Sequence, residues 1–314
     1  MSDLRDYRIA SETEGYEILL RNKRLVRDGE SGGENTVLFV HGATYGSTYT
    51  FDYPIEGRSW MDVMAEQGFD AWCIDLLGYG DSDRPREMDL PPQQNEPLVD
   101  TAYAVREVGR AVNFILQERG IRTVKLIGYS WGTAICGAYA SRYADNVSAL
   151  VLSGALWVAK DDSAAAIGVA SGAYRTVDAP SAIKRWRIGL SQVEIDKIVP
   201  AERVKQWCED VVQCDPANGF ESPRLRAPAG VMKDFQHCSV SGEPWYDPSE
   251  ITAPTQIVVG EFDRETTPAQ AQAVFARLSQ AAEKRLTIIG SGTHMLLLEN
   301  NRAALFGVVA DFLR

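Results

Sequence analysis

The chain has 314 residues, a mass of 34.6 kDa and a formal net charge of −11 at pH 7. With 45% hydrophobic and 24% charged residues it has the balance of a globular protein, long enough for one large domain or a domain with an insertion. Because an acidic molecule repels polyanions, we expect no nucleic-acid partner.

The N-terminal residues show no apolar core followed by a small-residue cleavage site, and no stretch reaches the roughly 18–20 apolar residues of a spanning helix. We therefore expect a cytoplasmic protein without membrane insertion, and homo-oligomer formation is left open. Five scattered cysteines favour reduced thiols, although a bridge from Cys208 to Cys214 or Cys238 stays open. With three histidines and no paired Cys/His spacing, the sequence predicts no metal site.

The first 30 residues predict an antiparallel hairpin at the edge of a sheet, and six short runs rich in Val, Ile and Leu predict further strands. These runs are residues 35–42, 70–78, 123–130, 147–154, 255–263 and 284–292. Nearly continuous apolar runs are typical of parallel strands buried on both faces. Helical patterns separate them: one of roughly 20 residues ending near Gly120, one at 131–143 and one at 268–281. The alternation predicts βαβ units and a doubly wound α/β fold.

The alternation stops between Leu156 and Thr252, where no run predicts a strand of the sheet but residues 181–190 and 201–212 have helical patterns. A structureless connection of that length is improbable inside a compact domain. We therefore predict a core formed by residues 1–155 and 252–314, interrupted by a helical insertion at 156–251.

The pentapeptide Gly128-Tyr129-Ser130-Trp131-Gly132 matches Gly-x-Ser-x-Gly between a predicted strand and a predicted helix. A strand that turns at once into a helix strains the residue at the bend, and flanking glycines remove side chains that would collide there. The bend lifts the Ser130 hydroxyl clear of the sheet and places the Trp131 backbone N–H at the helix N-terminus, where it can donate to an oxyanion. The motif alone is equally consistent with a tight packing turn, so a nucleophile here requires a base and an acid elsewhere.

His294 is the predicted base, because it follows the last predicted strand and precedes the final helix. His41 ends the strand at 35–42, where we expect it to pack or hydrogen-bond beneath the site. His237 lies in the insertion and follows no strand.

Asp263 is the predicted acid, because it closes the strand at 255–263 on the carboxyl edge of the sheet, where open α/β proteins assemble their sites. Asp161 is a rival after the strand at 147–154, and Glu261 is a weaker one. Asp75 precedes the serine, and the glycine-rich turn after it favours a carboxylate bonded to its own loop.

A second oxyanion donor is expected in the loop after His41. Gly42 allows that backbone to turn sharply. The Ala43 N–H is the predicted donor, with Thr44 as the alternative.

Five motifs occur in a fixed order: HGAT at 41–44, D-x-x-G-x-G-x-S at 75–82, GYSWG at 128–132, GEFD at 260–263 and GTH at 292–294. In this order the chain resembles the α/β-hydrolase superfamily over almost its entire length. The resemblance implies a mainly parallel eight-stranded sheet flanked by helices, an inserted helical cap, and a triad of Ser130, Asp263 and His294. A serine nucleophile speaks against the epoxide hydrolase and haloalkane dehalogenase branches, which place Asp there.

The loop sequences and motif spacings can be compared with those of individual branches of this superfamily. HGAT lacks the triple glycine of the lipase and esterase type and the HGGPG of proline iminopeptidases, although GYSWG is similar to the elbow of the latter. The long loop at 44–60 and the spacings from Ser130 to Asp263 and His294 are similar to those of bacterial monoalkyl phthalate ester hydrolases.

We therefore expect a serine esterase that works through an acyl-enzyme on a small to medium ester, such as an aromatic half-ester, with no metal or organic cofactor. Thr44, Met295, Trp186 and Trp245 are the expected substrate contacts, while core packing is the alternative for the insertion's aromatic residues, which also include Trp207, Phe235 and Tyr246. A substrate carboxylate has candidate partners in the basic residues Lys184, Arg185, Arg187, Arg224 and Arg226. The alternatives are C–C bond hydrolysis of a dienoate, aminopeptidase or other peptide cleavage, acyl transfer by the same triad, or a slow-turnover small-molecule binding protein.

Overall fold

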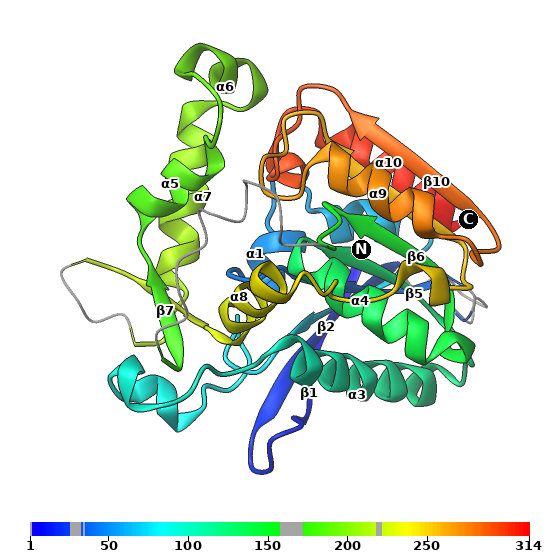
Figure 1. Cartoon of the computed structure of the whole chain (residues 1–314), viewed down its shortest axis with the longest axis horizontal. Helices are drawn as coiled ribbons and strands as arrows, with labels where there is room; N and C mark the ends of the chain where they lie inside the picture. Colours follow the sequence, from blue (N-terminus) through cyan, green and yellow to red (C-terminus); the bar gives the residue numbers. More distant parts are fainter. Residues whose placement is uncertain (1, 26–32, 34, 158–171, 218–221) are drawn as a thin grey trace.

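An eight-stranded sheet in the order β1-β2-β4-β3-β5-β6-β9-β10 forms the centre of the protein (Figure 1). The computed structural model describes residues 2–25, 33, 35–157, 172–217 and 222–314. The strands of the sheet are β1 (Ser2–Ala10), β2 (Glu17–Leu25), β3 (Thr36–Val40), β4 (Asp70–Asp75), β5 (Val124–Tyr129), β6 (Val147–Ser153), β9 (Thr255–Gly260) and β10 (Lys284–Ile289). Only β2 runs against the others, since it pairs antiparallel with both β1 and β4 while the remaining pairs are parallel. The predicted mainly parallel eight-stranded sheet and its edge hairpin are confirmed.

The burial of the strands follows their position in the sheet. Every residue of β3, β4 and β9 is buried, as expected for apolar strands covered on both faces. The prediction that β10 is buried in the same way is wrong, because β10 has only β9 as a neighbour and exposes Lys284, Arg285 and Ile288. Charged residues on an outer strand also protect it from pairing with another chain.

Helices cover both faces of the sheet (Figure 1). These helices are α1 (Ser47–Phe51), α2 (Trp60–Glu66), α3 (Thr101–Arg119), α4 (Trp131–Arg142), α9 (Pro268–Arg277) and α10 (Arg302–Leu313). One cluster of buried side chains joins the sheet to α3, α4 and α9, and a second joins it to α2 and α10. The predicted helix near Gly120 is α3, which the Asp100 side chain caps at its start and a left-handed Gly120 (φ 64°) ends. Within the described residues, no helix is both long and apolar enough to cross a membrane.

The segment between β6 and β9 contains, in its described part, the helices α5 (Ala179–Trp186), α6 (Gln192–Ile198), α7 (Ala201–Gln213) and α8 (Gly230–Ser241). It also contains an antiparallel pair that the sequence did not predict, β7 (Tyr174–Val177) with β8 (Leu225–Pro228). In Figure 1, α5, α6 and α7 stand to one side of the sheet, and their buried side chains share the cluster of α2 and α10. By contrast α8 lies against the core, because Asp234 accepts hydrogen bonds from the Thr101 N–H and hydroxyl at the start of α3.

All five cysteines are free thiols, and four of them are buried. The bridge from Cys208 to Cys214 or Cys238 that the sequence left open is therefore not formed. Burial alone raises the pKa of the Cys136 thiol above its ordinary range, so this cysteine stays protonated at neutral pH.

Candidate active site

Ser130 lies at the bend between β5 and α4, with φ 56° and ψ −121°. Positive φ is rare for a residue with a side chain and marks local strain. The glycines on either side are required by contact: a Cβ on Gly128 would lie 2.4 Å from the Gly132 carbonyl oxygen, and one on Gly132 would lie 2.1 Å from the Val40 carbonyl oxygen. The close crossing of β3, β5 and α4 thus explains the Gly-x-Ser-x-Gly spacing.

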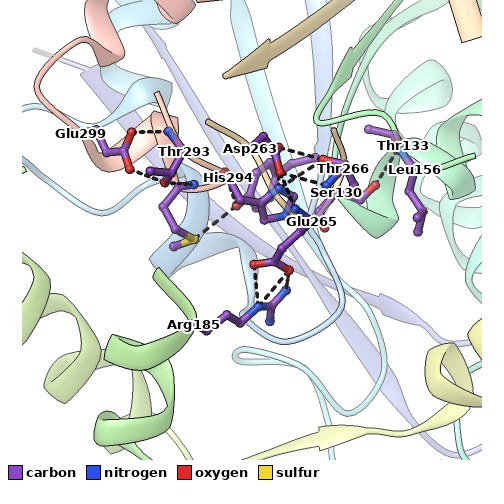
Figure 2. Close-up of polar contacts among 12 residues, drawn as sticks. Ser130, Thr133, Leu156, Arg185, Asp263, Glu265, Thr266, Thr293, His294 and Glu299 are labelled. Atoms are coloured by element: carbon purple, nitrogen blue, oxygen red, sulfur yellow. Dashed lines mark hydrogen bonds and ion pairs between the residues drawn. The ribbon is translucent and has the colours of Figure 1, made fainter. Parts of the chain in front are cut away.

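Ser130, His294 and Asp263 converge from three separate loops (Figure 2). The distance from His294 Nε2 to Ser130 Oγ is 2.9 Å, and the distance from His294 Nδ1 to Asp263 Oδ2 is 2.8 Å. All three side chains are buried. A chain of hydrogen bonds therefore runs from hydroxyl to imidazole to carboxylate.

The loop after β9 fixes the orientation of Asp263. Its Oδ1 accepts hydrogen bonds from the backbone N–H groups of Glu265 and Thr266, both at 2.9 Å, and its Oδ2 accepts one from the Thr266 hydroxyl at 2.8 Å. Because an ionised carboxylate only accepts, its second oxygen favours the proton of His294 on Nδ1, which leaves Nε2 as the acceptor for the Ser130 hydroxyl.

Nearby negative charges raise the pKa of the His294 imidazole. Burial lowers the pKa of His294, but the charges of Asp263 and Glu265 and the hydrogen bond to Asp263 outweigh it, so the pKa lies above its ordinary value. Burial alone would raise the pKa of Glu265, yet the charges of Arg185 and His294 bring it down to about 2. Glu265 is therefore ionised at neutral pH and favours the imidazolium that forms when His294 takes a proton.

The loop that carries His294 is held by a buried carboxylate, Glu299 (Figure 2). Glu299 accepts from the Thr293 N–H at 2.9 Å, from the Thr293 hydroxyl, and from Trp186 Nε1 at 3.0 Å. The Tyr129 hydroxyl donates to the His294 carbonyl oxygen at 2.9 Å. Sequence reasoning missed Glu299, although an acid directly after the apolar run MLLL is a signal for a buried and bonded carboxylate.

The two predicted oxyanion donors lie beside the serine. A Cβ on Gly42 would be 3.0 Å from Ser130 Cβ, so the loop that carries Ala43 passes directly over the bend. In the part of the chain that the structure describes, neither the Ala43 N–H nor the Trp131 N–H donates to a protein acceptor. Of the two residues, Ala43 lines the cavity beside Ser130, whereas Trp131 is buried and does not belong to that lining.

A small cavity opens onto Ser130 and His294. Its lining consists of Gly42, Ala43, Thr44, Tyr45, Thr50, Tyr129, Ser130, Arg185, His294 and Met295. Two of the expected substrate contacts, Thr44 and Met295, are part of this lining.

The structure places the other two expected substrate contacts elsewhere. Trp186 is buried among the helices of the insertion, where it crosses Trp207 edge to face with ring centroids 5.4 Å apart. Trp245 packs on Phe235 with ring centroids 4.9 Å apart, against the core cluster of α3 and α4. Neither indole belongs to the lining of the cavity, because each fills an apolar space between elements instead.

The remaining histidines take other roles. His41 is buried beneath the site, where its Nδ1 donates to the Gly42 carbonyl oxygen at 2.7 Å and its Nε2 accepts from the Leu76 N–H at 3.2 Å. Burial lowers its pKa, so it stays neutral. His237 is exposed and lies 2.9 Å from Glu243.

The rival acids lie away from His294 or outside the described residues. Asp75 accepts from the Asp81 N–H at 2.9 Å, as predicted for a carboxylate bonded to its own turn, and also from the Ser47 N–H of α1 at 2.5 Å. Glu261 is exposed and accepts from the Ser291 N–H at 3.0 Å. Asp161 lies outside the described residues.

Of the basic residues predicted to meet a substrate carboxylate, Arg185 alone lines the cavity. Arg226 forms an ion pair with Asp215, and Arg187 bonds to Gln192. Lys184 and Arg224 are exposed. A further guanidinium, that of Arg175 on β7, reaches the Ala43 loop and was not predicted.

Comparisons with known proteins relate the chain to a family and to solved structures. Residues 35–301 match the family described as "alpha/beta hydrolase fold". The human lipase member M is 26% identical over 133 residues, 41% of this chain and 31% of the lipase. A haloalkane dehalogenase of Bradyrhizobium diazoefficiens is 27% identical over 125 residues, 38% of this chain and 33% of the dehalogenase. The chain thus spans about a third of the length of these curated relatives. Among solved structures, an esterase from Exiguobacterium antarcticum superposes with a TM-score of 0.62 at 17% identity, covering 98% of each chain.

Proposed function

Because this chain belongs to the α/β-hydrolase fold family, we propose that it is a serine hydrolase that cleaves carboxylic esters. The observation that carries the proposal is the hydrogen-bonded series of Ser130, His294 and Asp263, with distances of 2.9 and 2.8 Å. A hydroxyl, a base and an orienting carboxylate in contact are the requirements for nucleophilic acyl chemistry.

In the proposed reaction His294 takes the Ser130 proton through Nε2 while Oγ attacks the ester carbonyl. The Ala43 and Trp131 N–H groups stabilise the oxyanion, and Asp263 stabilises the imidazolium. His294 then gives the proton to the leaving alcohol, and a water activated by the same imidazole hydrolyses the acyl-enzyme. Every proton passes through one nitrogen, so the mechanism needs neither a metal nor an organic cofactor.

The substrate class is a small to medium ester, with aromatic half-esters such as monoalkyl phthalates as the favoured group. The segment between β6 and β9 acts as the cap in this proposal, because Arg185 from α5 completes the wall of the cavity that holds Ser130 and His294. Thr44 and Met295 line the same cavity and would contact the substrate.

A covalent probe tests the nucleophile. A fluorophosphonate should label the wild-type protein and fail to label Ser130→Ala, because the probe phosphorylates only an activated serine. Ser141→Ala is the matched control, since Ser141 lies on the same helix and its hydroxyl donates to the Ala138 carbonyl oxygen of that helix. Equal labelling of wild type and Ser130→Ala would remove Ser130 as the nucleophile.

Turnover then separates the reaction classes. Ser130-dependent hydrolysis of p-nitrophenyl acetate and butyrate supports the esterase, whereas labelling without turnover supports a slow-turnover binding protein. Amide and dienoate substrates, and alcohols offered as acyl acceptors, test peptide cleavage, C–C hydrolysis and acyl transfer by the same residues.

A further inference from the structure

Two guanidinium groups converge on one hydroxyl above the candidate active site. Arg175 on β7 donates through Nη2 to the Thr44 hydroxyl and to the Ala43 carbonyl oxygen, both at 2.7 Å. Arg185 on α5 donates through Nη1 to the same Thr44 hydroxyl at 2.9 Å. Thr44 and Arg185 line the cavity that holds Ser130. Two like charges therefore lie within a few ångströms of each other beside the nucleophile.

Among the described residues, one of these two guanidinium groups has a carboxylate partner and the other has none. Glu265 pairs with Arg185 through both of its carboxylate oxygens (Figure 2). Arg175 has no carboxylate within 4.0 Å among the described residues, and its Nε–H is buried there without an acceptor. Burial lowers the pKa of Arg175, and the charge of Arg185 lowers it further, although a guanidinium stays protonated at neutral pH. Arg175, which lies behind the cavity-lining Thr44, thus carries a positive charge with no carboxylate in contact and has a donor left over.

We propose that Arg175 and Arg185 form an anion subsite that binds a free carboxylate of the substrate while Ser130 attacks its ester. The half-esters favoured above carry such a carboxylate, and the inference names the two residues that would bind it. This inference rests on the proposed function, which it makes more specific.

The chemistry of the two side chains fits a carboxylate. A guanidinium offers two parallel donors at the spacing of two carboxylate oxygens, and charged hydrogen bonds of this kind are stronger than neutral ones. Where little water is present, a positive charge with no carboxylate in contact attracts an anion more strongly than it would in bulk solvent. A neutral ester of the same shape leaves Arg175 with only the Thr44 and Ala43 oxygens as partners.

A purely structural role for Arg175 predicts a different outcome. Its bond to the Ala43 carbonyl oxygen also fixes the loop that carries a predicted oxyanion donor. Loss of that support alone would lower kcat for charged and neutral esters by the same factor. Loss of an anion subsite lowers kcat/KM for the half-ester only, so the ratio of the two substrates separates the two roles.

The experiment compares monobutyl phthalate with butyl 2-methylbenzoate, which has a neutral ortho group in place of the carboxylate. The selectivity is the kcat/KM of the first divided by that of the second. Arg175→Gln should lower the selectivity at least about tenfold, the loss of one charge-assisted hydrogen bond at about 1.4 kcal/mol per tenfold. Arg175→Lys should retain part of the selectivity, because lysine keeps the positive charge but lacks the two parallel donors of a guanidinium.

Arg185 is tested together with its partner. Arg185→Gln combined with Glu265→Gln removes both charges and avoids an unpaired carboxylate, and it should also lower the selectivity. Lys184→Gln is the control, because Lys184 is the exposed neighbour of Arg185 and carries the same charge. This control should keep wild-type selectivity.

A binding measurement keeps this test separate from the proposed function. Titration calorimetry on Ser130→Ala should show tighter binding of monobutyl phthalate than of butyl 2-methylbenzoate, and Arg175→Gln added to that variant should abolish the difference. Equal binding of the two esters, or unchanged selectivity in Arg175→Gln, would overturn the anion subsite. Absence of Ser130-dependent hydrolysis of any ester overturns the proposed function instead.

Discussion

Replacing Asp263 by asparagine tests the predicted acid most directly. The two backbone N–H groups of Glu265 and Thr266 hold one carboxylate oxygen at 2.9 Å, so an asparagine keeps its oxygen there and places its NH2 group toward His294. That group would replace the acceptor that now lies 2.8 Å from His294 Nδ1. Since an NH2 group only donates, it favours the tautomer with the proton on Nε2, which cannot take the proton of Ser130.

The expected loss is large because the variant removes both the correct tautomer and the charge that stabilises the imidazolium. The same change in a Ser-His-Asp triad lowers kcat by about 10⁴, which corresponds to about 5.5 kcal/mol at 1.36 kcal/mol per tenfold. Steady-state hydrolysis of p-nitrophenyl butyrate measures it, with thermal unfolding as the check that Asp263→Asn is folded.

Glu261→Gln is the control for Asp263→Asn. Glu261 lies in the same loop, and its change removes the same charge. Its side chain is exposed and accepts a hydrogen bond from the Ser291 N–H. This variant should stay within about threefold of wild type, since an exposed carboxylate contributes little. If Asp263→Asn also stays within that range while Glu261→Gln loses activity, the acid has been assigned to the wrong residue.

Three further results are expected. Activity should fall as the pH drops through the raised pKa of His294. Glu265→Gln should move this acidic limb of the kcat/KM profile to lower pH, because the variant removes a negative charge that favours the imidazolium. An acidic limb at the wild-type pH would contradict this role of Glu265. Gly132→Ala should lower the free energy of unfolding, measured in urea, by about 1–3 kcal/mol, since the new methyl group would lie 2.1 Å from the Val40 carbonyl oxygen at the end of β3. Wild-type stability would show that β3 and α4 can move apart without cost. Thr133→Val replaces the side chain by one of the same shape and should lower the free energy of unfolding by about 1–3 kcal/mol, because the buried Leu156 N–H loses its acceptor at 2.8 Å. An unchanged unfolding midpoint would mean that this amide finds another partner.

The strands and the three residues of the candidate triad could be predicted because each leaves a local signal. The runs around Val37, Val151 and Val258 are short and almost continuously apolar, as expected of buried parallel strands, and the carboxyl ends of parallel strands share one edge of the sheet. His294 and Asp263 each follow such a run, so their meeting with the serine follows from the topology.

The roles of the insertion depend on contacts between distant residues and leave no such signal. Strands β7 and β8 have four residues each, with arginines and a proline, so no apolar run marks them. Arg175 reaches Ala43 across 132 positions of the chain, and no periodicity encodes that contact. The two readings of Trp186, substrate contact and core packing, stay open in the sequence for a related reason, because an indole can fill either a core or a pocket wall.

The contacts of Glu299 limit how far this protein can be treated as modular. One carboxylate receives a donor from Trp186 on α5 and two donors from Thr293, the residue before His294. A chimera that takes its helices α5–α7 from a relative would leave that carboxylate short of one partner while it still holds the histidine loop. An exchange that preserves activity therefore has to transfer Trp186 and Glu299 together. The segment to be exchanged then includes part of the loop that carries His294, in addition to the residues between β6 and β9.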